Sequence, residues 1–170
     1  MNYFVTMFEV FFKPRLRFNK IKNDDRKDII FYTFFISLIF YIFYLSHIIL
    51  RIRKNDLPRE LIHFSFLFNK FNIWVVIYFL TLLVAIFLIL LVITFVLSWI
   101  AKIILSIFKV KIRLSVIWYI MVYSFTPIIA WQLLVLISYI LNFGVKSWVI
   151  LVYVYILILI IIGIKNQIKT

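Results

Sequence analysis

The amino-acid sequence predicts an all-α, polytopic transmembrane helix bundle with four spans and an N-terminal interfacial amphipathic helix. Hydrophobic residues make up 66% of the 170-residue chain and charged residues 15%, well below the roughly 25% typical of soluble domains. All nineteen basic residues and all six carboxylates lie outside four long uncharged stretches. Most of the chain is therefore suited to hydrocarbon, and its length predicts a single transmembrane domain over residues 1–170.

Each uncharged stretch is long enough to cross a bilayer as a helix. The second runs from Phe71 to Ala101 without a charged residue, glycine or proline. As a helix it would be ~46 Å long, against roughly 30 Å of bilayer hydrocarbon, so it is expected to tilt or to project beyond the bilayer. The predicted spans cover about residues 29–50, 73–100, 115–141 and 147–164.

An aromatic stripe precedes the first span. Phe4, Phe8 and Phe11 recur at helical spacing until Lys13 and Pro14 end the pattern. The stripe predicts a short helix lying on the membrane with its aromatic side chains in the interface, and packing against the bundle explains it equally well.

Two polar segments flank the first span. Asp24 and Asp25 are expected to be solvated near the start of that helix, where negative charge favours the helix dipole. After the span, residues 55–60 resemble a helix start, and the apolar segment 61–68 is too short to cross the membrane. We expect segment 61–68 to be interfacial or re-entrant.

A basic segment follows the second span. Lys102, Ser106, Lys109 and Arg113 form a polar stripe at helical spacing, which predicts that the second span continues beyond the bilayer with its lysines reaching towards phosphate. A basic helix that binds lipid or a partner is the alternative. Together with Lys111, these basic residues are the candidates for contacting anionic lipid headgroups.

The distribution of basic residues predicts the orientation. With four spans, one side receives seven, four and two lysines and arginines, thirteen in all, and the other side receives six. This bias places both termini in the cytoplasm of a prokaryotic plasma membrane, or in the matrix if the membrane is the mitochondrial inner membrane. Five spans would separate the termini. The net charge of +13 is thus explained by topology and anionic lipid, and not by nucleic acid.

The composition argues against several kinds of chemistry. The chain has no cysteine, which excludes disulfides and thiolate sites. No carboxylate, lysine or arginine lies within a span, which argues against ion-coupled transport and intramembrane hydrolysis. His47 and His63, even with Asp56 and Glu60, make a poor metal site. We therefore predict no enzyme activity, no cofactor and no metal.

The most distinctive local feature lies in the third span, where Tyr123-Ser124-Phe125-Thr126-Pro127 predicts a kink. Pro127 cannot donate to the carbonyl of Tyr123, and the Ser124 and Thr126 hydroxyls can bond the freed carbonyls. The kink serves either helix packing or a hinge or pocket. Further along the span, Gln132 is the strongest candidate for an interhelical contact.

The chain resembles the Yip membrane family, the Rab-interacting proteins of the early secretory pathway and their prokaryotic relatives. The resemblance rests on a Phe-Phe-Lys-Pro-Arg segment that includes Pro14 and Arg15, on a Tyr-x-x-Thr-Pro signature at Tyr123, Thr126 and Pro127, and on a final helix closing at Gly163. Family members usually have five spans, whereas four are expected here.

The resemblance implies a non-enzymatic membrane adaptor or scaffold that organises partner membrane proteins or lipids. Two other classes fit the composition equally well. One is an accessory subunit of a large respiratory or ATP-synthase complex, possibly encoded in an organelle. The other is the membrane subunit of an exporter that is driven by a partner ATPase.

Overall fold

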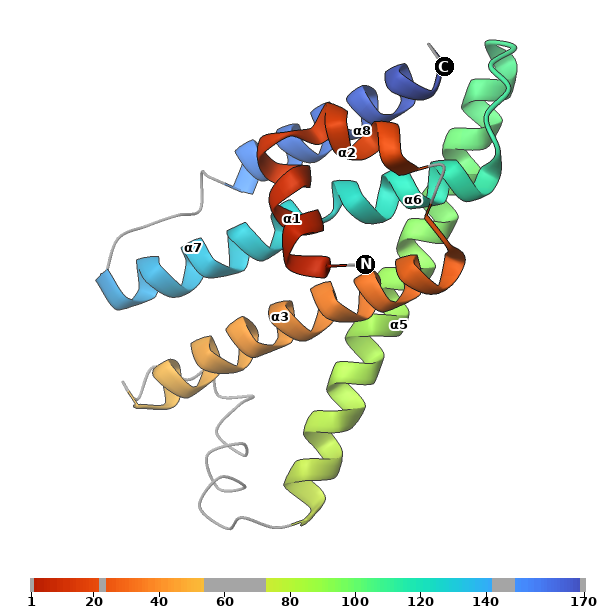
Figure 1. Ribbon diagram of the computed structural model, residues 1–170. Helices are drawn as coiled ribbons and strands as arrows, with labels where there is room; N and C mark the ends of the chain where they lie inside the picture. The colour runs from red at the N-terminus through yellow and green to blue at the C-terminus, as the bar shows by residue number, and fades with distance from the viewer. Residues whose placement is uncertain (1, 22–23, 54–72, 142–148, 169–170) are drawn as a thin grey trace.

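The structure is a computed structural model that describes residues 2–21, 24–53, 73–141 and 149–168. Within these ranges the chain is helical and contains no strand (Figure 1). The helices are α1 (Tyr3–Phe12), α2 (Pro14–Lys20), α3 (Arg26–Arg53), α5 (Ile73–Ile107), α6 (Leu114–Ser124), α7 (Pro127–Leu141) and α8 (Val149–Ile168). The expected interfacial or re-entrant piece at 61–68 lies outside the described residues.

Within the described ranges, four segments are long and apolar enough to cross a membrane, which confirms the predicted bundle of four membrane-spanning helices. They are Arg26–Arg51, Val76–Ile107, Leu114–Leu141 and Val149–Ile168. The third comprises α6 and α7 together. α5 has 35 residues, so it is ~52 Å long at ~1.5 Å per residue. It therefore exceeds the hydrocarbon thickness, and it also runs at a steep angle to α3 and α7 (Figure 1).

Consecutive spans run in opposite directions, so α3 and α7 run the same way (Figure 1). α3 contacts α5 and α7, α5 contacts α6, and α8 contacts both α6 and α7. The start of α3, the end of α5, the start of α6 and the end of α8 lie at the same end of the bundle (Figure 1, right). We call this the basic end, because it carries Arg26, Lys27, Lys111, Arg113 and Lys165.

α1 and α2 form an N-terminal helix pair that packs onto this bundle. Pro14 occupies the first turn of α2, where its missing N–H costs nothing. The pair contributes Val10, Phe18 and Ile21 to the main core, beside Tyr32 and other residues of α3, α6 and α8. The pair is therefore part of the fold.

The outer face of α1 carries the aromatic stripe. Phe4, Phe8 and Phe12 are exposed, whereas Thr6 and Val10 on the opposite face are buried. The interpretation that this helix packs against the bundle is confirmed, and its position in the membrane interface stays a prediction. One face of α1 packs on the bundle, and the exposed aromatic face is free to enter lipid.

The last helix differs from its expected end. Gly163 does not close α8, which continues to Ile168. Instead, a Cβ at Gly163 would lie 2.6 Å from Cγ2 of Ile120 on α6, so glycine is required by close packing. Beyond it, Nε2 of the buried Gln167 donates to the Phe18 carbonyl at 2.8 Å, which ties the end of α8 to α2.

Candidate functional site

A buried polar cluster lies where α2, α3 and the junction between α6 and α7 meet. We use this name for Arg17, Asp24, Tyr32, Tyr123 and Thr126. They come from four separate segments of the chain, and Tyr32, Tyr123 and Thr126 are fully buried. The cluster contains two of the three residues of the Tyr-x-x-Thr-Pro signature, with Pro127 directly beside it.

The junction between α6 and α7 is a full interruption of the helix. α6 ends at Ser124 and α7 begins at Pro127, which has no N–H to bond the Tyr123 carbonyl. That carbonyl instead accepts hydrogen bonds from the Thr126 backbone N–H at 3.1 Å and from Thr126 Oγ1 at 2.6 Å. The predicted kink is confirmed, and Thr126 satisfies the freed carbonyl as expected. The same expectation is wrong for Ser124, whose Oγ is buried and makes no hydrogen bond within the described part of the chain.

Tyr32 of α3 holds the junction from the other side. Its hydroxyl lies 3.0 Å from Thr126 Oγ1. Because the Thr126 hydroxyl proton already serves the Tyr123 carbonyl, Tyr32 must be the donor in this pair. The Tyr32 and Tyr123 rings also meet edge to face, with centroids 5.0 Å apart. The signature residues therefore dock the interrupted span on α3.

Arg17 of α2 supplies the positive charge of the cluster. Its Nη2 lies 2.5 Å from Asp24 Oδ2 and also bonds the Tyr123 hydroxyl. Its guanidinium carbon lies 4.5 Å from the centroid of the Tyr123 ring, a cation–π geometry. The Tyr123 hydroxyl in turn donates to Asp24 Oδ2 at 2.8 Å. These three side chains form a closed triangle of hydrogen bonds.

The opposite charges of Arg17 and Asp24 are paired and largely shielded from water. The Arg17 and Asp24 side chains are only 6% and 10% exposed. Burial by itself lowers the pKa of Arg17, and the adjoining Tyr123 and Asp24 side chains outweigh it and raise the pKa above its usual value. Arg17 therefore stays charged at any physiological pH, and the cluster acts as an ionic clasp between the N-terminal helix pair and the third span.

The expectation for the acidic pair before the first span is wrong for Asp24. Asp25 is exposed, but Asp24 is the carboxylate of the polar cluster. The difference arises because Arg17 and Tyr123 approach Asp24 only in the folded chain, 7 and 99 residues away in sequence. The residues next to Asp24 in sequence give no sign of these partners, so they predict a solvated carboxylate.

The basic segment after the second span also departs from its expected form. The helical stripe ends at Ser106, because α5 stops at Ile107 and Lys109 adopts a left-handed conformation with φ of 58°. The Val110 N–H bonds the Leu105 carbonyl at 2.9 Å, the arrangement of a Schellman motif. Lys102 does not extend towards lipid but bonds the Ile112 carbonyl.

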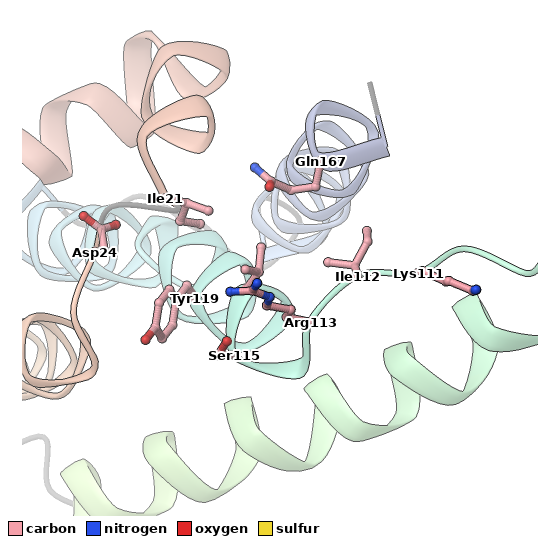
Figure 2. A pocket seen from close by; sticks show the side chains of 9 residues that line it. Ile21, Asp24, Lys111, Ile112, Arg113, Ser115, Tyr119 and Gln167 are labelled. Atoms are coloured by element: carbon pink, nitrogen blue, oxygen red, sulfur yellow. The ribbon is translucent and has the colours of Figure 1, made fainter. Parts of the chain in front are cut away.

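A polar pocket opens beside the cluster at the basic end (Figure 2). Its volume is about 530 Å³, within the range of ligand sites. Its walls come from the link between α2 and α3, the segment before α6, the first turns of α6 and the end of α8. The lining residues are Ile21, Asp24, Lys111, Ile112, Arg113, Ser115, Val116, Tyr119 and Gln167.

The remaining candidate residues lie apart from the cluster. Arg15 is exposed on α2, and its carbonyl accepts from Asn166 Nδ2 at 3.2 Å. Gln132 is half-buried on α7 and makes no side-chain hydrogen bond within the described part of the chain. Lys109 is exposed beyond the end of α5. The structure thus unites the signature residues with α2, and it leaves Gln132 outside that site.

The histidines show no metal geometry in the described ranges. His47 packs edge to face on Tyr139, with ring centroids 5.0 Å apart, and His63 lies outside the described residues. Among the residues that the structure describes, no group of three His, Asp or Glu side chains is placed to hold a metal ion.

Sequence reasoning missed Arg17, Tyr32 and Tyr119 as site residues. One feature of the sequence could have indicated Arg17. Arg17 is a basic residue between the apolar residues Leu16 and Phe18. Tyr32 and Tyr119 had no such feature, since tyrosine is common throughout this chain.

Comparison with known proteins gives one match. The family model described as Yip1 domain matches residues 8–168, nearly the whole chain. No curated protein and no solved structure matches it. The matched region includes α2, the polar cluster and the residues that line the polar pocket.

Proposed function

This chain belongs to the Yip1 domain family, and from this premise we propose that it is a non-enzymatic integral membrane adaptor that organises partner membrane proteins or lipids. The observation that carries the proposal is the polar cluster. The family signature of Tyr123, Thr126 and Pro127 is engaged in holding α2 and α3 against the third span. These residues hold the helices together. The buried carboxylate of Asp24 accepts hydrogen bonds from Arg17 and Tyr123, so it has a structural role.

The outer surface of the bundle supports the same role. The most apolar 18-residue stretch of α5 contains no buried residue, and α1 presents Phe4, Phe8 and Phe12 outwards. In lipid such surfaces contact acyl chains or the helices of neighbouring proteins. An adaptor needs wide apolar surfaces of this kind on a rigid frame.

For orientation, we propose that the basic end faces the cytoplasm of a prokaryotic plasma membrane. The support is the excess of lysine and arginine in the segments that meet at that end. Anionic lipid headgroups on that side would be attracted to Lys109, Lys111 and Arg113.

Copurification tests the adaptor role. The full chain, tagged and extracted in mild detergent, is expected to retain other integral membrane proteins. Pro127→Ala adds an N–H that can bond the Tyr123 carbonyl and join α6 to α7, so the variant should retain less partner. Leu133→Ala, exposed on the same helix, is the matched control and should retain as much partner as the wild type.

Two outcomes would reject the adaptor. Stoichiometric comigration with respiratory or ATP-synthase subunits would identify an accessory subunit of such a complex. Stimulation of a bound ATPase by a transported substrate would identify an exporter subunit. Equal partner yield from Pro127→Ala and the wild type would show that the interruption of the third span has no part in assembly.

A further inference from the structure

The polar pocket at the basic end is lined by a tyrosine whose ring is buried and whose hydroxyl is not. Tyr119 on α6 is only 5% exposed, it lines the pocket, and its hydroxyl has no hydrogen-bond partner among the described residues. Its hydroxyl is therefore available to a molecule that occupies the pocket.

The start of α6 adds donors to the same wall. Arg113 is the N-cap of α6 and provides no side-chain cap, while its carbonyl accepts from the N–H groups of Val116 and Ile117. The N–H groups of Leu114 and Ser115, in the first turn, have no helical acceptor. Ser115 also lines the pocket, and its hydroxyl makes no hydrogen bond within the described ranges.

The charge of the pocket is positive. Arg113 and Lys111 line it, and neither forms an ion pair with a described residue. In Figure 2 the Arg113 guanidinium lies between Tyr119 and Ile112, whereas the Lys111 amine points away from the other labelled side chains. The acid on the wall, Asp24, is already neutralised by Arg17. An unpaired guanidinium, hydroxyl donors and an uncapped helix N-terminus are together suited to a phosphate group.

We propose that this pocket binds a phosphate ester, with the headgroup of an anionic membrane lipid as its source. Arg113 would carry the charge, and Tyr119, Ser115 and the first N–H groups of α6 would donate to the phosphate oxygens. The pocket lies where the spans end, which is the level of lipid headgroups. The site does not depend on the adaptor role, since copurification of partners can succeed or fail independently of it.

Native mass spectrometry of the full chain in detergent tests the site by titration with phosphatidylglycerol. We expect phosphatidylglycerol to bind at least roughly tenfold more tightly than phosphatidylcholine. Arg113→Gln should weaken binding about tenfold or more, the range for a hydrogen bond to a charged group, and Tyr119→Phe about fivefold. Lys165→Gln removes one positive charge at the same end but outside the pocket, so it should change binding less than about twofold.

The outcomes separate the possible sources of the phosphate. In one outcome, soluble glycerol 3-phosphate displaces phosphatidylglycerol from the wild type but not from Arg113→Gln. That result would support a phosphate site whose ligand is a soluble ester and not a lipid. Equal losses of phosphatidylglycerol binding in Arg113→Gln and Lys165→Gln would overturn the proposal, because the lipid would then be held by the overall positive charge of this end and not by the pocket. If Arg113→Gln does not fold, Tyr119→Phe decides, since it removes one hydroxyl that has no hydrogen-bond partner among the residues the structure describes. Unchanged binding by Tyr119→Phe would then overturn the proposal.

Discussion

Asp24→Asn is the most direct test of the ionic clasp. The substitution keeps the size of the side chain and its capacity to accept one hydrogen bond, but it removes the negative charge 2.5 Å from Arg17 Nη2. The Arg17 guanidinium is then left charged in a site where its side chain is 6% exposed. It cannot neutralise itself by losing a proton, because a guanidinium remains protonated in proteins.

The expected loss follows from the cost of a buried charge without its counterion. Removing one partner of a buried ion pair typically costs about 3–5 kcal/mol. Because Tyr123 remains as a neutral partner, we expect about 3 kcal/mol for Asp24→Asn. Arg17→Met should cost a similar amount. The double variant should cost less than the two single losses together, with a coupling of about 2 kcal/mol or more, because neither charge is then left alone.

The assay is the free energy of unfolding of the purified chain in mixed detergent micelles, measured for both single variants and the double variant. Asp25→Asn is the matched control, since Asp25 is exposed and asparagine caps a helix as well as aspartate does. It should change stability by less than about 0.5 kcal/mol. Equal effects of Asp24→Asn and Asp25→Asn, or strictly additive losses in the double variant, would refute the clasp.

Two other predictions concern the N-terminal helix pair and the orientation. Tyr155→Phe removes the hydroxyl that donates to the Phe11 carbonyl at 2.7 Å, so α1 should exchange its amide hydrogens faster by about fivefold, or about 1 kcal/mol of opening free energy. Tyr153→Phe, at an exposed position on the same helix, should leave exchange unchanged, and equal exchange in both variants would contradict the contact. Because the chain has no cysteine, single cysteines can report the orientation. An impermeant thiol reagent added to intact cells should label Lys146→Cys and spare Lys165→Cys, and the reverse pattern would overturn the orientation.

Much of the architecture was predictable from the sequence because it depends on local composition. A run of about twenty apolar residues has to be helical in lipid, where each backbone polar group needs an internal partner. The interruption at Pro127 was predictable for the same reason, since a missing N–H acts on its own helix. The end of α5 was not, because the left-handed turn at Lys109 is unusual for a residue other than glycine.

The candidate site was predictable only in part. Tyr123, Thr126 and Pro127 stood out because they are close together in sequence. Arg17, Asp24 and Tyr32 did not, because the partners that join them to the third span, Tyr123 and Thr126, lie 94 to 106 residues away in sequence. The same limit applies to Gly163, whose role is set by the approach of Ile120 on another helix.

The sequence by itself determined that this is a multi-pass membrane protein with apolar segments long enough to span a bilayer, because hydrophobic length is a local property of the chain. It also determined where charge is concentrated, and hence the predicted orientation. Only the tertiary structure decided which charges are buried together and which remain available. Arg17 and Asp24 neutralise each other inside the fold, while Arg113 and Tyr119 line the same pocket. The physical reason is that pairing energies depend on distance and burial, which arise only when separate helices pack.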